Sequence, residues 1–561
     1  MNDRGNDITP AAEGTCSWLL EHKIYKDWNS QSRGLLWIKG KPGAGKSTLL
    51  KYALQTFQRQ EHSLPNKLTT LSFFFHGRGA EIQRTPLGLF RSLLHQLLDQ
   101  FPDPCSDVVR IFKDKYDKIG QPVDKWNWHP QELQGFLEAC LPKALEKCPI
   151  LIMVDALDEC GEEKAVSLVE RFERLLSQCS SAKNGLSICF SCRHYPIVSL
   201  DNGFEVCVEH ENQDDITKYI RDELQGTIKK DKDLEVLQKE ILDGSSHVFQ
   251  WVVLVLPMAL SEYRKGRSLP HIQKKLRQIP KELGSLYRTI LETLKEDDDE
   301  RSQSLLLIQW ICFALRPLSL TELRFAMIVS QDTPYHSFHE CQKSPDFVES
   351  DEQMNNRLKC LSGGLAEVKV HKGGPVVQFI HQSVNDYLIE EGLQTLDGSL
   401  ESKDKSIGHA HSRLSRSCIR CIAMEEIHQW LSRDNGDLED YKRWYTEGLV
   451  LTKEFSFALY ATRSWLPHAA AAEAKNVSQE GLLDSLGWPS ASVMQNWVSI
   501  FRLTDRYSNS APSDGTTLLH EASRHGITSI VTAILRKLNN RNVDANPKDP
   551  DGQTPLSWAA E

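Results

Sequence analysis

The run Gly40-Lys41-Pro42-Gly43-Ala44-Gly45-Lys46-Ser47 indicates the architecture of the N-terminal part of this chain. It fits the phosphate-loop pattern G-x-x-x-x-G-K-[ST] at every fixed position. The apolar run Gly34–Lys39, typical of a buried strand, precedes it, and Thr48–Leu54 follows with the apolar spacing of a helix. Strand, glycine loop and helix in this order predict a loop that binds phosphate through backbone N–H groups and a helix N-terminus.

The loop predicts a set of contacts to a nucleotide. Lys46 is expected to reach the β- and γ-phosphates, and the Ser47 hydroxyl is expected to hold Mg²⁺. The cofactors that this pattern predicts are ATP or GTP, ADP and Mg²⁺, without a choice between the two bases. The other cofactor-binding positions that we predict are Gly40, Pro42, Gly43, Ala44, Gly45 and Thr48.

A second apolar run, Ile150–Val154, ends in the acidic segment Asp155-Ala156-Leu157-Asp158-Glu159. In a parallel sheet, such a strand delivers its carboxylate to the edge where the phosphate loop lies. Asp155 is therefore expected to bind Mg²⁺, directly or through water. Asp158 or Glu159 is expected to orient or deprotonate the attacking water, and the sequence leaves that choice open. The alternative, merely solvated acids, is less favoured because the phosphate loop is intact.

A third strand-like run, Leu186–Ser191, is followed by Cys192 and Arg193. At the carboxyl edge of the sheet, Arg193 is in a position to contact a γ-phosphate and to report its presence. A surface ion pair is the alternative role. We favour the γ-phosphate role and include Arg193 among the catalytic candidates.

Apolar runs and helical patterns alternate along residues 33–213, which predicts an α/β domain with a parallel sheet and helices on both faces. A chain of 561 residues is too long for one core, so a multidomain protein is expected. The predicted strands are Leu35–Ile38, Leu71–Phe75, Ile150–Val154, Leu186–Ser191 and Phe204–Val208. The other predicted parts are a lead-in helix (1–32), a helical domain (214–300), a winged-helix-like domain (301–395), a helical region (396–510) and repeats (511–561).

The repeats are visible as a sequence that occurs twice near the C-terminus. The segment Asp514–Ala522 recurs as Asp551–Ala559, with cores similar to the ankyrin pattern T-P-L-H-x-A. This predicts a short α-helical ankyrin solenoid that binds protein partners. Because two copies are too few to bury a solenoid face, we expect that the repeat array is truncated.

Composition narrows the class of partner. The net charge is −10, and no basic stripe interleaved with aromatic residues stands out, so no nucleic-acid partner is expected. The longest apolar stretches are too short to span a bilayer, so no membrane partner is expected. The 14 cysteines follow no framework spacing, which favours reduced thiols and a cytoplasmic location.

Together these motifs resemble a known family. Leu35–Thr48, Asp155–Glu159, Phe190–Pro196 and Arg84–Leu94 are similar to the phosphate loop, Walker-B segment, sensor segment and a further segment of fungal NACHT-domain NTPases. These are NLR-like proteins of the STAND class of signalling P-loop NTPases. The resemblance is specific over residues from about 15 to 210 and looser beyond them.

The resemblance implies a nucleotide-dependent switch with slow ATP hydrolysis, oligomerisation in the active state, and an ankyrin sensor. The family's signalling roles in innate immunity and heterokaryon incompatibility are implied with it. His381, in a segment similar to the family's winged-helix module, is implied to contact the β-phosphate of ADP, with a structural histidine as the equal alternative. Only about 32 residues precede the first strand, so we expect that an effector domain is absent, belongs to another protein or was lost from the predicted gene.

Two other functions stay open. One is a mechanical P-loop ATPase, which the acidic net charge disfavours. The other is a non-enzymatic scaffold in which the nucleotide is structural, which the intact pair Asp158 and Glu159 disfavours.

Overall fold

The computed structural model describes most of the chain, in two compact units. The first comprises Met1–Leu286 with His381–Ser383, and the second comprises Tyr287–Ile380 with Val384–Glu561. Tyr195 and Pro196 of the sensor-like segment, and Asp514 and Asp551 of the repeats, lie outside the described residues. The described residues are 3–31, 33–61, 68–77, 79, 81–120, 127–194, 203–294, 298–329, 335–371, 374–398, 402–432, 453–505, 512, 515–539, 546–549 and 552–560.

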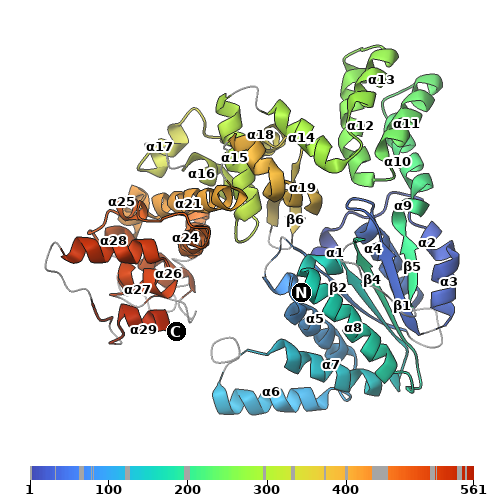
Figure 1. Cartoon of the computed structure of the whole chain (residues 1–561), viewed down its shortest axis with the longest axis horizontal. Helices are drawn as coiled ribbons and strands as arrows, with labels where there is room; N and C mark the ends of the chain where they lie inside the picture. The colour runs from blue at the N-terminus through green and yellow to red at the C-terminus, as the bar shows by residue number, and fades with distance from the viewer. Residues whose placement is uncertain are drawn as a thin grey trace. The chain divides into compact units, whose positions relative to one another are not determined.

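The first unit is built on a five-stranded parallel sheet, as predicted (Figure 1). Its strand order is β2-β3-β4-β1-β5, so β1, which leads into the phosphate loop, lies between β4 and β5. Each predicted strand is present within two residues of its predicted ends. The strands are β1 (Gly34–Lys39), β2 (Thr69–Phe74), β3 (Ile150–Asp155), β4 (Leu186–Cys192) and β5 (Phe204–Cys207).

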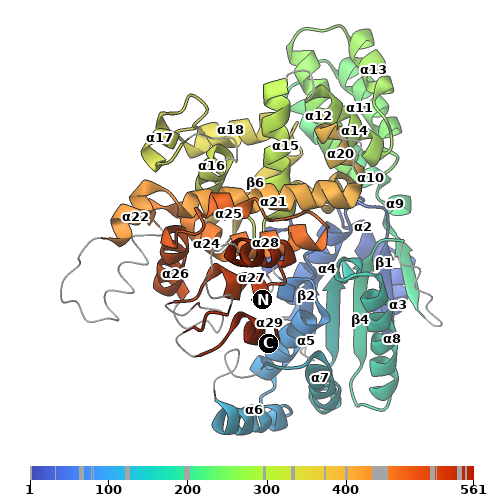
Figure 2. The ribbon, with the colours of Figure 1, turned by 60° about the vertical axis from the view of Figure 1, so that its left-hand side comes forward.

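Alternating side chains of the strands form two separate cores, one on each face of the sheet. Leu35 and Trp37 of β1 pack into a core with α5, α7 and α8, whereas Leu36 and Ile38 pack into a core with α2, α3 and α4. The continuous apolar runs of the strands follow from this burial on both faces. Figure 1 and Figure 2 show the helices on either side of the sheet, which confirms that prediction.

The helices of the first unit begin where the sequence supplies start signals. Thr85 and Pro86 open α5, with Pro86 in the first helical turn, where a missing N–H costs nothing. Further on, His129 caps α7 in a capping box with Glu132. The helices are α1 (Asp3–Asp7), α2 (Trp18–Glu21), α3 (Lys23–Ser30), α4 (Lys46–Glu61), η1 (Glu81–Gln83), α5 (Pro86–Gln100), α6 (Ser106–Ile119), α7 (Pro130–Leu145), η2 (Leu157–Cys160), α8 (Glu162–Gln178), α9 (Val208–Glu211), α10 (Gln213–Gln225), α11 (Asp231–Ser245), α12 (Phe249–Arg264) and α13 (Leu269–Gln278).

The second unit is mainly helical and contains one β-hairpin. In the hairpin, β6 (Ala366–His371) pairs antiparallel with β7 (Gly374–Phe379), and β7 also bonds to Leu318 ahead of α16. Helices followed by a hairpin agree with the expected order of elements, while a winged-helix identity remains a prediction. The helices from the junction onward are α14 (Leu283–Thr293), α15 (Asp298–Phe313), α16 (Leu320–Ile328), α17 (Phe338–Lys343), α18 (Asp351–Leu361), α19 (Gln382–Tyr387), η3 (Leu388–Gly392), α20 (Leu393–Asp397), α21 (Lys403–Ile422), α22 (Glu425–Leu431), α24 (Ser456–Ala474), α25 (Leu482–Ser485), α26 (Ser492–Asp505), α27 (Leu518–Arg524), α28 (Thr528–Asn539) and α29 (Pro555–Ala560).

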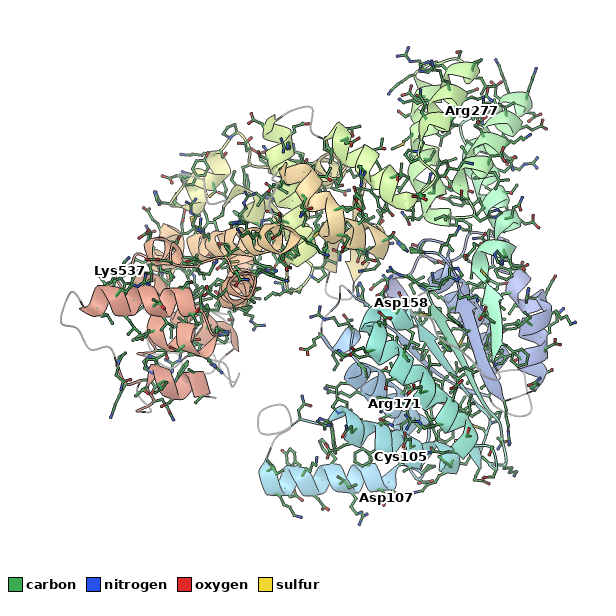
Figure 3. The ribbon with its side chains drawn as sticks, in the orientation of Figure 1. Cys105, Asp107, Asp158, Arg171, Arg277 and Lys537 are labelled. Atoms are coloured by element: carbon green, nitrogen blue, oxygen red, sulfur yellow. The ribbon has the colours of Figure 1, made fainter. Side chains whose placement is uncertain are left out.

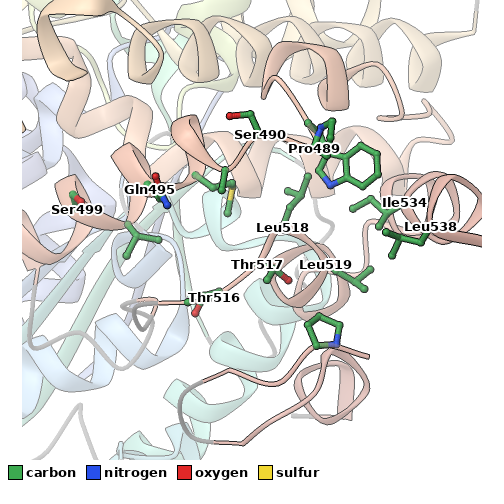
Figure 4. A pocket seen from close by; sticks show the side chains of 16 residues that line it. Pro489, Ser490, Gln495, Ser499, Thr516, Thr517, Leu518, Leu519, Ile534 and Leu538 are labelled. Atoms are coloured by element: carbon green, nitrogen blue, oxygen red, sulfur yellow. The ribbon is translucent and has the colours of Figure 1, made fainter. Parts of the chain in front are cut away.

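The repeat-like segments form helices that pack together. The helix α27 lies against α28 and α29, and His520 Nε2 lies 3.3 Å from the Gln553 carbonyl of the second copy. A cavity of about 400 Å³ opens between α26 and these helices, lined largely by apolar side chains such as Met494, Leu519 and Ile534 (Figure 4). The packing agrees with a helical repeat, and the ankyrin assignment itself remains a prediction.

A membrane crossing requires a long apolar helix. Across the part of the chain that the structure describes, no helix combines the necessary length and apolar character.

Candidate nucleotide-binding site

The phosphate loop lies between the end of β1 and the start of α4. Gly43 and Gly45 have φ angles of +77° and +100°, a backbone conformation that glycine adopts without strain. A Cβ atom on Gly43 would also lie 2.5 Å from Gln250 Cβ, so only glycine fits there. Lys46 Nζ donates to the carbonyl oxygens of Gly40 at 2.7 Å and Lys41 at 2.9 Å, which holds the ammonium over the loop. Burial lowers the pKa of Lys46, against the opposing charge of Asp158.

Asp155, the last residue of β3, is fully buried at this edge of the sheet. Its Oδ1 accepts a hydrogen bond from Ser191 Oγ at 2.5 Å. Burial raises the pKa of Asp155, while the Ser191 hydroxyl, the nearby Ser47 hydroxyl and the charges of Arg4 and Lys46 oppose that rise. Among the described residues, nothing donates to Asp155 Oδ2, although that atom is buried.

An unpartnered buried carboxylate oxygen calls for a cation or a donor. The hydroxyls of Ser47 and Ser191 lie beside Asp155, and the charges of Arg4 and Lys46 also act on it. Hard oxygen ligands, such as this carboxylate and these hydroxyls, are the ones that Mg²⁺ prefers. The predicted metal ligands Ser47 and Asp155 therefore lie together and fit Mg²⁺.

The three candidates for chemistry, Asp158, Glu159 and Arg193, lie at the same end of the sheet and have separate partners. Arg193 Nε donates to Asp158 Oδ2 at 2.9 Å, so the two candidates form an ion pair. Glu159 Oε2 accepts the backbone N–H of Gly77 at 2.5 Å, which ties it to the segment after β2. Figure 3 shows Asp158 at the end of the sheet opposite Cys105. The choice of Asp158 or Glu159 for the water-positioning role remains open.

Glu209 is a residue of the site that the sequence analysis missed. It follows β5 in α9 and is only 7% exposed. Its Oε2 accepts the backbone N–H of Lys41 at 3.2 Å, and its Oε1 lies 2.5 Å from His194 Nε2. Although burial acts to raise it, the pKa of Glu209 is lowered, chiefly by the hydrogen bond from His194. The sequence did contain a signal for Glu209, since it is an acidic residue directly after the fifth predicted strand. The carboxyl ends of parallel strands share one edge of the sheet, so this residue could have been placed near the phosphate loop.

A second missed group lies on the other side of the loop. Asn212 Nδ2 donates to the carbonyl oxygens of Ala44 at 3.1 Å and His247 at 3.0 Å. The Gln250 N–H donates to the Gly43 carbonyl at 3.1 Å. Both residues are buried, so the start of α12 is joined to the phosphate loop by hydrogen bonds. A lone polar residue inside the apolar run Phe249–Leu256 was the sequence signal for Gln250.

His381 belongs to the segment His381–Ser383, which groups with the first unit. Its Nδ1 accepts the backbone N–H of Ser383 at 3.1 Å and lies 2.7 Å from Ser383 Oγ. These bonds give His381 a local role at the start of α19. A contact between His381 and a β-phosphate remains a prediction.

A comparison with protein families matches the part of the chain that runs from the segment before the phosphate loop to the end of β4. Residues 14–193 match the family described as "Nephrocystin 3, N-terminal". This range includes the phosphate loop, Asp155, Asp158, Glu159 and Arg193.

Among curated proteins, the chain is similar to the vegetative incompatibility protein HET-E-1 of Podospora anserina. The two are 25% identical over 388 residues, which is 66% of this chain and 26% of the relative. The chain therefore spans about a quarter of the length of that relative.

Solved structures give weaker likenesses, which cover most of this chain. A STAND protein with a tetratricopeptide repeat sensor from Pyrococcus horikoshii has a TM-score of 0.33 at 13% identity, covering 95% of this chain and 70% of that chain. The ORC2 protein of Aeropyrum pernix has a TM-score of 0.31 at 14% identity, covering 71% of this chain and 99% of that chain. Scores of this size do not establish a shared fold. The likeness of the chain is therefore to the matched family over residues 14–193 and, at 25% identity, to HET-E-1.

Proposed function

We propose that the chain is a nucleotide-dependent signalling switch that exchanges ADP for ATP with Mg²⁺ and is reset by slow hydrolysis of the ATP. The observation that carries this proposal is the buried, unpartnered Oδ2 of Asp155 beside Ser47, at the sheet edge that also holds Lys46. Burying a carboxylate without a partner is costly, so a protein retains such a group where a ligand completes it.

In this proposal each residue of the site has a separate role in binding or hydrolysing the nucleotide. Lys46 turns from the Gly40 and Lys41 carbonyls to the β- and γ-phosphates, while Ser47 and Asp155 hold Mg²⁺. When bound, the metal neutralises charge that develops on the phosphates. Asp158 or Glu159 orients the attacking water, and the backbone of the loop holds the remaining phosphate oxygens.

In this proposal the chain has an off state with ADP bound and an on state with ATP bound. The γ-phosphate, which only ATP carries, distinguishes the two states. A ligand shifts a conformational equilibrium only by the difference between its affinities for the two states. Charge-assisted contacts between Arg193 and the γ-phosphate provide such a difference for ATP. We propose that His381 contacts the β-phosphate of ADP in the off state. In the on state the chain forms a homo-oligomer. Because HET-E-1 is named for vegetative incompatibility, we infer a related signalling output in the cytoplasm, with the C-terminal repeats as a protein-binding sensor.

The test measures nucleotide content and turnover of the purified full chain. We expect bound ADP after purification, a rise in unfolding temperature with millimolar ATP and Mg²⁺, and turnover well below the common enzyme rate of about 10 per second. Neither bound nucleotide nor stabilisation by ATP and Mg²⁺ would refute the proposal. Fast turnover stimulated by nucleic acid or protein would favour a mechanical ATPase instead.

A further inference from the structure

Three side chains with metal-binding atoms meet beside the phosphate loop. His194 follows β4, Cys207 ends β5, and Glu209 lies in α9. One ligand atom from each lies within 4.8 Å of the other two. The strand register explains why the three side chains are close. Lys39 at the end of β1 pairs with Cys192 of β4 on one side and with Cys207 of β5 on the other, so the ends of β4 and β5 flank the same residue.

The donor set is an imidazole nitrogen, a thiol sulfur and a carboxylate oxygen. Mg²⁺ selects oxygen ligands, whereas Zn²⁺ binds nitrogen, sulfur and oxygen together, often with three protein ligands and one open position. We propose that His194, Cys207 and Glu209 bind a Zn²⁺ ion whose fourth position is taken by water. This site is separate from the Mg²⁺ ligands Ser47 and Asp155.

Small side-chain movements are enough to form the site. His194 Nε2 and Glu209 Oε1 lie 2.5 Å apart, and two ligands of a tetrahedral zinc lie about 3.3 Å apart at usual bond lengths. The His194 side chain is 43% exposed, whereas Glu209 is buried and its other oxygen accepts the Lys41 N–H. Glu209 therefore stays as the fixed ligand, and His194 moves to open the space.

Zinc binds the thiolate form of cysteine, so the Cys207 thiol releases its proton to solvent when the metal binds.

Cobalt is the probe for the first experiment, since tetrahedral Co²⁺ bound to a thiolate absorbs in the near ultraviolet by charge transfer. The full chain is stripped with a chelator and titrated with Co²⁺. We expect one tight equivalent with that absorption in the wild-type chain and in the control Cys360→Ser, which changes an exposed cysteine elsewhere. We expect its loss in Cys207→Ser. No thiolate band in the wild type, or an unchanged band in Cys207→Ser, would overturn the proposal.

His194→Ala gives a second test at a ligand whose own side chain is partly exposed. We expect an unchanged circular dichroism spectrum and a zinc affinity lowered by about tenfold or more in competition with a chelating dye. An unchanged zinc affinity would overturn the proposal and leave His194 and Glu209 as a hydrogen-bonded pair that positions Lys41. Both tests read metal binding without nucleotide, so their outcome is independent of the proposed switch.

Discussion

Arg193 holds both oxygens of the Asp158 carboxylate, through its Nε at 2.9 Å and its backbone N–H at 3.3 Å. A guanidinium carries five N–H donors, and the printed pair with Asp158 uses the one on Nε. The pair therefore fixes the orientation of the Arg193 side chain at the carboxyl end of β4, from which we propose that it contacts a γ-phosphate.

Replacing Arg193 is expected to affect ATP more than ADP. For Arg193→Ala we predict an ATP affinity lowered by about tenfold, with the ADP affinity nearly unchanged, because only ATP carries the γ-phosphate. Fluorescent-nucleotide competition with both ligands measures this. Arg174→Ala, an exposed arginine on α8, is the control. Equal losses for ATP and ADP would remove the γ-phosphate role.

Lys46→Ala is expected to abolish nucleotide binding. The substitution removes the ammonium that the loop holds through the Gly40 and Lys41 carbonyls, and with it the charge facing the phosphates. Calorimetric titration with ATP and Mg²⁺ tests this, with the exposed neighbour Lys41→Ala as the matched control. Tight ATP binding by Lys46→Ala would contradict the site assignment.

Glu159→Gln is expected to keep nucleotide binding and to slow phosphate release by about a hundredfold, the usual contribution of a general base. The amide still accepts the Gly77 N–H, so the local fold is preserved. Single-turnover phosphate release measures the change. If Glu159→Gln releases phosphate normally and Asp158→Asn does not, the water-positioning role belongs to Asp158.

Asn212→Ala is expected to destabilise the first unit by about 1–3 kcal/mol and to weaken ATP binding. The substitution leaves the Ala44 and His247 carbonyls without their donor in a buried place. Chemical denaturation and ATP titration measure the two effects. A variant with wild-type values in both would show that these bonds do not hold the loop.

Glu521 of α27 predicts a pH-dependent stability of the C-terminal helices. Burial raises its pKa to about 7, from a reference of 4.5. Between these values the folded protein keeps a proton that the unfolded chain has released, so raising the pH through this interval costs up to about 3 kcal/mol of stability. His525 Nε2 lies 3.7 Å from Glu521 Oε2, and Arg524 opposes the shift.

Hydrogen exchange of α27 and α28 tests this dependence. At pH 8 we expect greater protection in Glu521→Gln than in the wild-type chain, because the amide needs no deprotonation. Near pH 4.5 the difference is expected to vanish. Comparing both proteins at the same pH removes the intrinsic effect of pH on exchange, and equal protection at pH 8 would contradict the prediction.

The sheet was predictable from sequence because strands buried on both faces read as unbroken apolar runs, as in Ile150–Val154. The motifs likewise predicted that Ser47 and Asp155 lie close together, as they do in the structure. Glu209 and Asn212 escaped because their role depends on β5 lying next to β1, and strand order is set by tertiary packing. Gln250 escaped because its segment reads as a core helix, and nothing local shows that the helix starts against the loop.

The hydrogen bond from the Gln250 N–H to the Gly43 carbonyl couples the phosphate loop to α12. This bond joins the loop backbone to the first turn of α12, a helix of 16 residues about 24 Å long. We therefore expect that a change in the Gly43 peptide acts first on the start of α12, directly after Ser246 and His247, which both have positive φ angles.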